Sequence, residues 1–197
     1  MGVNSNEQIA FESYCDFVTK TVEKVTAADV LSKLTLSSEV ARVLKDTNLF
    51  PLGSYALRHV RRDHLIADFS LVYELKEEVH TKVNDKVILE WLCGHLKSTI
   101  SAIQSSGSSK FNCDVKLESP EYGYDNRTCY ILLKDKNSGH GVRIFASEKI
   151  ELSPGAQVFE HEEIIIHVAK MNLILKKIDN NAREYFDMCC ALMKFWR

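Results

Sequence analysis

Residues 49–75 read LFPLGSYALRHVRRDHLIADFSLVYEL, and this stretch decides the fold that the sequence predicts. A Gly-Ser pair, Gly53-Ser54, precedes a run in which one acid, Asp68, stands among Leu, Ile, Phe, Val and Tyr. Such a run predicts a β-strand, and residues two apart on a strand share a face. The face of Asp68 also carries Ser70, Val72 and Glu74, whereas the other carries Ala67, Phe69, Leu71, Tyr73 and Leu75. We therefore expect one buried face and one mixed face.

The stretch resembles the polymerase-beta-like nucleotidyltransferases, in which a Gly-Ser turn is followed by a strand carrying Asp-x-Asp or Asp-x-Glu. Their paired carboxylates hold two divalent cations about 3.5–4 Å apart, which flank the attacking and leaving oxygens of a phosphoryl displacement. Here Ser70 stands where the second acid would be, and a neutral hydroxyl is a poor metal ligand. Glu74 shares the face of Asp68, but six residues of strand put it roughly 20 Å away. The motif therefore predicts a nucleotidyltransferase fold that does not catalyse the phosphoryl displacement.

The composition is that of one compact domain, or one domain with part of a second. The chain has 197 residues, of which 45% are hydrophobic and 26% charged, and its net charge is -2. Such a balance gives no global attraction to nucleic acid or to an anionic membrane. The six cysteines form no CxxC pair and no zinc-site spacing, so we expect reduced thiols and no metal site. With no membrane span or signal peptide in the sequence, we expect a nuclear or cytoplasmic protein.

Residues 1–48 are expected to form N-terminal helices that pack on the core. Apolar residues at spacings of three and four predict a helix over 9–25, and shorter helices are predicted over 26–34 and 38–46. Between the Gly-Ser pair and the Asp68 strand lies the densest group of cations, which includes Arg58, Arg61 and Arg62. This group fits contact with phosphates or an acidic partner, and it fits a solvated loop equally well.

Residues 49–158 are expected to form a mixed sheet with a helix. A helix is predicted from Asn84, a good N-cap, to the serine-rich run that begins at Ser105. Three strands are predicted after it, over 111–117, 129–133 and 141–146. Residues 159–197 are predicted to be two helices that begin a C-terminal helical lobe. The last helix has an apolar face that either meets a partner or belongs to a larger domain, and the face contains Tyr185, Leu192 and Trp196.

The order of these elements is similar to that of the DZF domain, which is found in the interleukin enhancer-binding factors and the zinc-finger RNA-binding protein. The segments that carry the resemblance are GSYALRHVRRDHLIADFSLVYELK at 53–76, the strand at 141–147 and LKKIDNNAREYF at 175–186. The resemblance implies a nucleotidyltransferase fold that has lost catalysis and serves as a dimerisation module. Asp68 matches the acid that the family keeps. A third acid would be expected on a later, neighbouring strand, where this sequence offers Arg143 and no carboxylate.

The fold class that we predict is α+β, a mixed sheet of the polymerase-beta-like nucleotidyltransferase type. The function that we predict is a catalytically inactive scaffold in an RNA-binding or RNA-processing complex. It would have no cofactor and no metal, and it would form a homodimer or heterodimer with a protein partner through the C-terminal helices. RNA would be bound through the complex, and no membrane would be bound.

Two alternatives remain open from the residues. One is an active nucleotidyltransferase, and the other is a domain that binds ATP or UTP with Mg²⁺ without reacting, through Gly53, Ser54 and Asp68. A Gly-Ser turn can present backbone N–H groups to phosphate, which favours the second. Asp68 also fits a structural acid held by hydrogen bonds.

Overall fold

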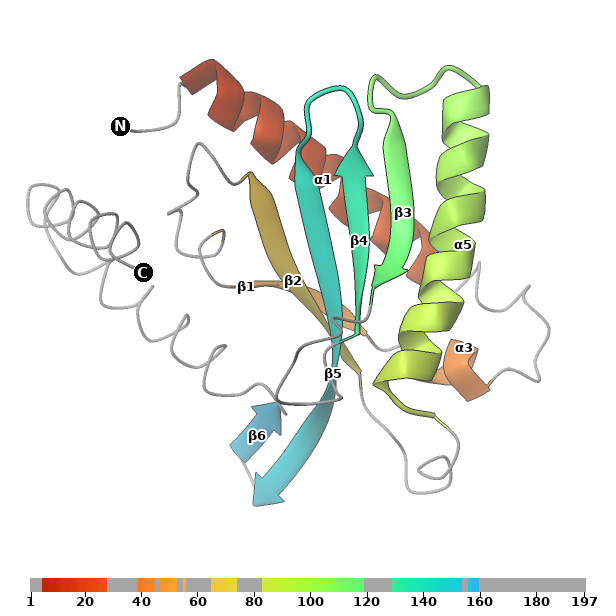
Figure 1. The fold of residues 1–197 in the computed structure, drawn as a ribbon. Coiled ribbons are helices and arrows are strands. Elements are labelled where there is room, and N and C mark those ends of the chain that lie inside the picture. The colour runs from red at the N-terminus through yellow and green to blue at the C-terminus, as the bar shows by residue number, and fades with distance from the viewer. Residues whose placement is uncertain are drawn as a thin grey trace, which may run out of the picture.

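The computed structural model describes residues 5–27, 39–44, 47–52, 55, 65–73, 83–118, 129–153 and 156–159. These residues form a mixed sheet with helices, as Figure 1 shows. The helices are α1 (Ser5–Thr26), α3 (Glu39–Leu44) and α5 (Asp85–Ser105). The strands are β1 (Asn48–Leu52), β2 (Ile66–Tyr73), β3 (Cys113–Glu118), β4 (Tyr130–Asp135), β5 (Gly141–Ser153) and β6 (Ala156–Phe159).

The sheet is built around a parallel pair of strands, β2 and β5. The strand order is β1-β2-β5-β4-β3, and β6 pairs with the far end of β5. The other pairs in the sheet are antiparallel. A parallel pair needs a crossover between its strands, and α5 lies in the segment that joins β2 to β5. The Asp68 strand is thus central, with partners on both sides.

One face of the sheet packs against α1 and α5. Alternate residues of β2, β5 and β4 point to this side, because side chains on a strand alternate between faces. Fully buried positions include Ala67, Leu71, Ile131, Leu133, Val142 and Ile144. α5 begins at the predicted N-cap, where the Asn84 side chain accepts a hydrogen bond from the N–H of Val87 at 3.0 Å. The core therefore lies between the helices and one sheet face.

Some polar groups are buried under α1. The Tyr14 hydroxyl lies 3.0 Å from Cys113 Sγ, which joins the helix to the edge strand β3. Burial, the largest cause, raises the pKa of the Cys113 thiol to about 11, so it stays protonated at neutral pH. His140, in the turn between β4 and β5, is 4% exposed and touches the rings of Phe11 and Tyr14. Apolar surroundings thus hold these groups in their neutral forms.

The observed elements follow the predicted order, with different bounds. The mixed-sheet α+β fold class is confirmed. The strand predicted over 141–146 runs on to Ser153 and pairs with β6, a strand that the sequence analysis does not predict. Residues 28–34 of the helix predicted over 26–34 lie outside the described residues, as do the helices predicted after 159, whereas Thr26 ends α1. The predicted division into three regions stays a prediction. Across the described ranges, no helix is long and apolar enough to cross a membrane.

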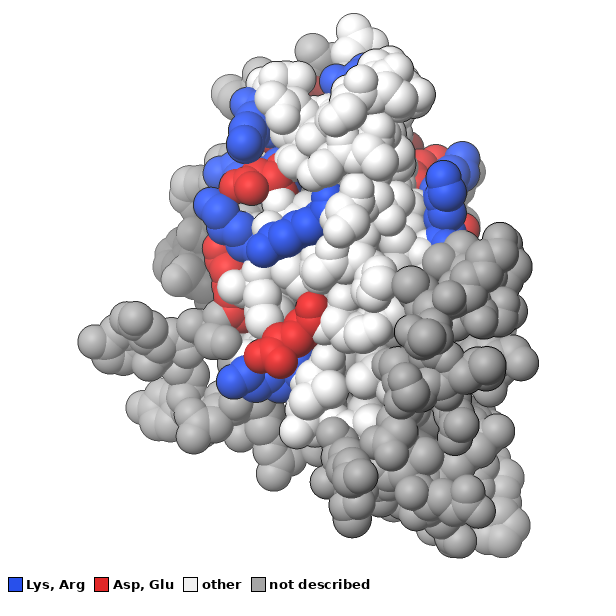
Figure 2. All heavy atoms as spheres, turned by 90° about the vertical axis from the view of Figure 1, so that its right-hand side faces the viewer, with Lys and Arg blue, Asp and Glu red and all other residues white. Residues whose placement is uncertain are grey.

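Figure 2 shows the side of the molecule on which α5 lies. Basic and acidic side chains are intermixed there, with neutral surface between them. On α5 itself, Lys86 and Glu90 are exposed and lie 3.9 Å apart as an i, i+4 pair. A surface with both signs interspersed offers no cationic track for a nucleic acid among the residues described on this side.

Candidate functional site

The second face of the sheet, opposite α1 and α5, carries polar side chains at its centre. Asp68 lies on β2 directly across from Arg143 on the parallel strand β5. Their strand neighbours Ala67 and Ile144 are buried in the core on the other face. Because alternate residues face opposite ways, the alternation that builds the core also places Asp68 and Arg143 side by side.

Asp68 and Arg143 form a two-pronged ion pair. Arg143 Nε donates to Asp68 Oδ1 at 2.7 Å, and Nη2 donates to Oδ2 at 3.0 Å. The two side chains keep 24% (Asp68) and 32% (Arg143) of their exposure, so solvent reaches the pair. Partial burial acts to lower the pKa of Arg143, but the hydrogen bonds and charge of Asp68, aided by Tyr130, outweigh it and raise that pKa. Arg143 is therefore a permanent cation.

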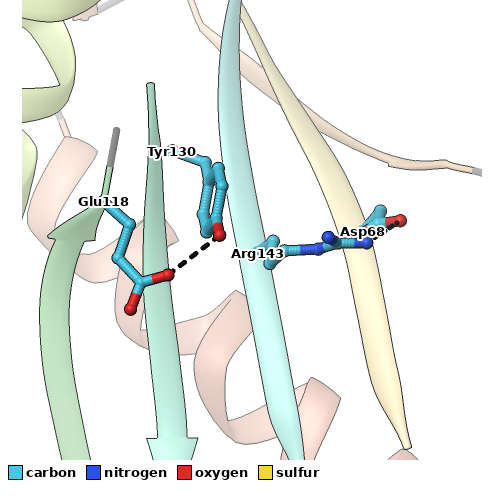
Figure 3. A network of polar contacts seen from close by, with 4 residues as sticks. All are labelled: Asp68, Glu118, Tyr130 and Arg143. Carbon is cyan, nitrogen blue, oxygen red and sulfur yellow. Dashed lines mark hydrogen bonds and ion pairs between the residues drawn. The ribbon is translucent and has the colours of Figure 1, made fainter. Parts of the chain in front are cut away.

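Two aromatic rings border the guanidinium, and Figure 3 shows one of them, that of Tyr130. Arg143 Cζ lies 5.7 Å from the centre of the Tyr130 ring and 5.9 Å from that of Phe145. The rings pack on each other at 5.4 Å. The Tyr130 hydroxyl donates to Glu118 Oε2 at 2.8 Å. Desolvation, reinforced by Glu118, raises the pKa of Tyr130, so its ring stays neutral. The rings and Glu118 thus hold one edge of the site in a fixed arrangement.

Ser70, at the second-acid position of the motif, is closed off from solvent. Its hydroxyl donates to that of Ser147 at 2.8 Å, and both side chains are fully buried. This bond joins β2 to β5 next to the ion pair. Ser70 therefore has a structural partner of its own.

The residues present do not fit the divalent-ion pair that the fold implies. Both oxygens of Asp68 accept hydrogen bonds from Arg143. The second position is the buried hydroxyl of Ser70, and the position opposite Asp68 on β5 is itself a cation. In the part of the chain that the structure describes, no group of three or more His, Cys, Asp or Glu could hold a metal ion. These three positions therefore offer one carboxylate, one hydroxyl and one guanidinium in place of a set of carboxylate ligands.

All of the predicted site residues other than Asp68 lie outside the described residues. These are the Gly-Ser pair, the cation group and the apolar C-terminal face, namely Gly53, Ser54, Arg58, Arg61, Arg62, Tyr185, Leu192 and Trp196. Their proposed roles in binding nucleotide, phosphate or a partner stay predictions.

Sequence reasoning missed three members of the site, Tyr130, Phe145 and Glu118. It did expect a strand beside that of Asp68 with Arg143 on it, and the register confirms this. The missing signal was the pairing of β4 with β5, which sets Tyr130 beside Phe145. The strand predicted over 111–117 ends one residue before Glu118, which is the last residue of β3.

Comparison with known proteins identifies the fold. No protein-family model and no curated protein matches this sequence. Among solved structures, it is similar to CdnC of E. coli MS115-1 in a complex with HORMA-deltaN, with TM-score 0.59 and 14% identity over 98% of this chain and 51% of that chain. It is also similar to the same strain's CdnC with ATP, with TM-score 0.58 and 13% identity over 99% of this chain and 53% of that one. The chain has a nucleotidyltransferase-like fold. It spans about half the length of the CdnC chains.

A third structure, terminal uridylyl transferase 4 of Trypanosoma brucei with bound UPU, matches 66% of this chain and 39% of its own at 19% identity. Its TM-score of 0.27 carries no structural argument. The DZF domain is not among the matches described above, and that finer resemblance stays a prediction.

The prediction that this chain is not an enzyme is contradicted by these comparisons. It rested on the missing second and third acids and on the DZF resemblance. The structures that share the fold over almost the whole chain are instead those of CdnC, one of them determined with ATP. At 13% and 14% identity the likeness shows the fold of this chain and not its activity.

Proposed function

We propose that this chain binds a nucleoside triphosphate on the polar sheet face and forms the nucleotide-binding half of a nucleotidyltransferase. The observation that carries the proposal is the Asp68–Arg143 pair, which lies at the centre of the sheet on the face that α1 and α5 leave uncovered. The shared fold with CdnC, which has been determined with ATP, supports it.

The chemistry of this face suits a nucleotide. A guanidinium offers N–H groups in a fixed plane that matches phosphate oxygens, and Asp68 holds the orientation of that plane. The half-buried rings of Tyr130 and Phe145 lie beside it and offer flat apolar surface to a base. Exposed Lys134 lies on the same face of β4 as Tyr130 and adds a second cation. Phosphate contact and base stacking can thus come from neighbouring strands.

Calorimetric titration of ATP and UTP into the purified chain, with and without Mg²⁺ or Mn²⁺, tests the proposal. We expect saturable binding of at least one nucleotide. An incorporation assay on an RNA primer then asks whether the bound nucleotide is transferred. Absence of heat for both nucleotides in all conditions would refute nucleotide binding, and product formation would extend the proposal from binding to transfer.

A further inference from the structure

An arginine occupies the place at which a nucleotidyltransferase fold would otherwise present an anionic metal ligand. A divalent cation at Asp68 would need the carboxylate oxygens that Arg143 already engages at 2.7 and 3.0 Å. It would also lie beside a permanent positive charge, which would repel it. On the proposed function, therefore, the phosphates need a different positive group at this position.

We infer that the guanidinium of Arg143 takes the place of a divalent cation at Asp68 and contacts the phosphates of a nucleoside triphosphate directly. The pair with Asp68 uses Nε and Nη2, and the N–H groups of Nη1 lie outside it, on a guanidinium that also interacts with the Tyr130 hydroxyl. Asp68 acts as the positioning residue, because its two oxygens fix the guanidinium plane between β2 and β5. The inference rests on the proposed function and deepens it, since it names what binds the phosphates.

The charges around Arg143 distinguish this inference from binding through a metal ion. Asp68 neutralises most of the field of Arg143, and Glu118 adds a negative charge next to Tyr130. A site of this kind binds anions through directed N–H groups more than through net charge. Removing the charge of Asp68 should then help an anion, whereas in a metal site it would remove a ligand. The two chemistries thus predict opposite signs for one substitution.

The test is ATP titration into the purified 197-residue chain in EDTA and again in Mg²⁺. We expect equal affinity in the two buffers. Arg143→Gln should weaken binding about 10- to 100-fold, as the loss of hydrogen bonds to a charged group implies. The matched control is Lys97→Gln, which removes one exposed positive charge from α5 on the opposite side of the sheet and should leave affinity unchanged.

Asp68→Asn separates the two chemistries by the sign of its effect on ATP affinity. Its amide oxygen can still accept from Nε, so we expect ATP affinity in EDTA to be kept or to rise by up to about 10-fold. Thermal melting checks that each variant is folded. If Arg143→Gln does not fold, Arg143→Lys replaces it, with a smaller loss expected because the charge stays and the planar fork is gone.

The outcomes separate the inference from the proposed function. Binding that requires Mg²⁺, binding in EDTA that Arg143→Gln leaves unchanged, or a large loss with Asp68→Asn would each overturn the inference while nucleotide binding stands. No binding in either buffer would overturn both. Metal-independent binding that depends on Arg143 and survives Asp68→Asn would establish it.

Discussion

The two faces of the central sheet are built from the same strands and differ most around Asp68 and Arg143, although Ser70 and Ser147 on that second face are buried. On the face under α1 and α5, aliphatic side chains such as Leu133 and Ile144 are fully buried. On the other face, the neighbouring residues Leu132 and Arg143 keep contact with solvent. The difference teaches that one strand can place buried apolar side chains on one side and charged side chains within reach of solvent on the other, one residue apart. Substitutions on the two faces should therefore have separable effects.

The largest contrast is expected between Leu133 and Leu132, which are the same residue type on opposite faces of β4. Leu133→Ala should lower the free energy of unfolding by about 3–5 kcal/mol, because it leaves a cavity in the core. Leu132→Ala removes a partly exposed side chain and should cost about 1 kcal/mol. Urea denaturation measures both. Equal losses would mean that the sheet face carrying Leu132 is packed as tightly as the core.

Acid should destabilise the fold through the face that α1 and α5 cover, because His140 is buried there. Burial lowers the pKa of His140, although the charges of Asp135 and Glu7 oppose this. Between the ordinary His pKa of about 6.5 and the lowered folded value, the unfolded chain binds more protons than the folded one. The contribution of neutral His140 to the free energy of unfolding is complete above that range. It falls as pH drops through the range, by up to about 1.4 kcal/mol per pH unit. Urea titrations between pH 8 and pH 5 measure this slope. His140→Leu should flatten it, and an unchanged slope would assign the acid effect to other groups.

The ion pair should contribute less to stability than either of these. Because Asp68 and Arg143 remain partly exposed, a double-mutant cycle with Asp68→Asn and Arg143→Gln should give a coupling of about 1 kcal/mol. Repeating the cycle in 1 M NaCl should reduce it, since salt screens exposed charges. A coupling of several kcal/mol that ignores salt would mark the pair as part of the core.

The smallest effect is expected at Tyr130. Tyr130→Phe removes the hydrogen bond to Glu118 and keeps the ring against Phe145, so it should cost about 0.5 kcal/mol. If the ring supports a base, nucleotide affinity should be nearly unchanged in this variant and reduced in Tyr130→Ala. Titration of ATP into both variants tests this, and equal affinities would remove the ring from the site.

Much of the fold could be predicted because its signals are local. The alternation around Asp68 gave the correct faces of β2, and helical spacing after Asn84 gave α5 with its cap. The partner of Asp68 is not local, since Arg143 lies 75 residues further on. Sequence reasoning saw that Arg143 replaces a carboxylate but could not see that it binds the remaining one. The inactive interpretation rested on the missing acids and on the DZF resemblance, and the likeness to CdnC contradicts it.

The parallel pairing of β2 with β5 has a consequence for how the chain assembles. The helix α5 and the antiparallel pair β3–β4 join segments that are close in sequence, and such contacts form early. The ion pair closes a loop of 75 residues, and closing a long loop costs entropy before any contact repays it. During synthesis, the polar face is therefore incomplete until β5 has emerged and aligned with β2. On the proposed function, a nucleotide bound to this face would favour the last pairing of the sheet over the partly folded states before it.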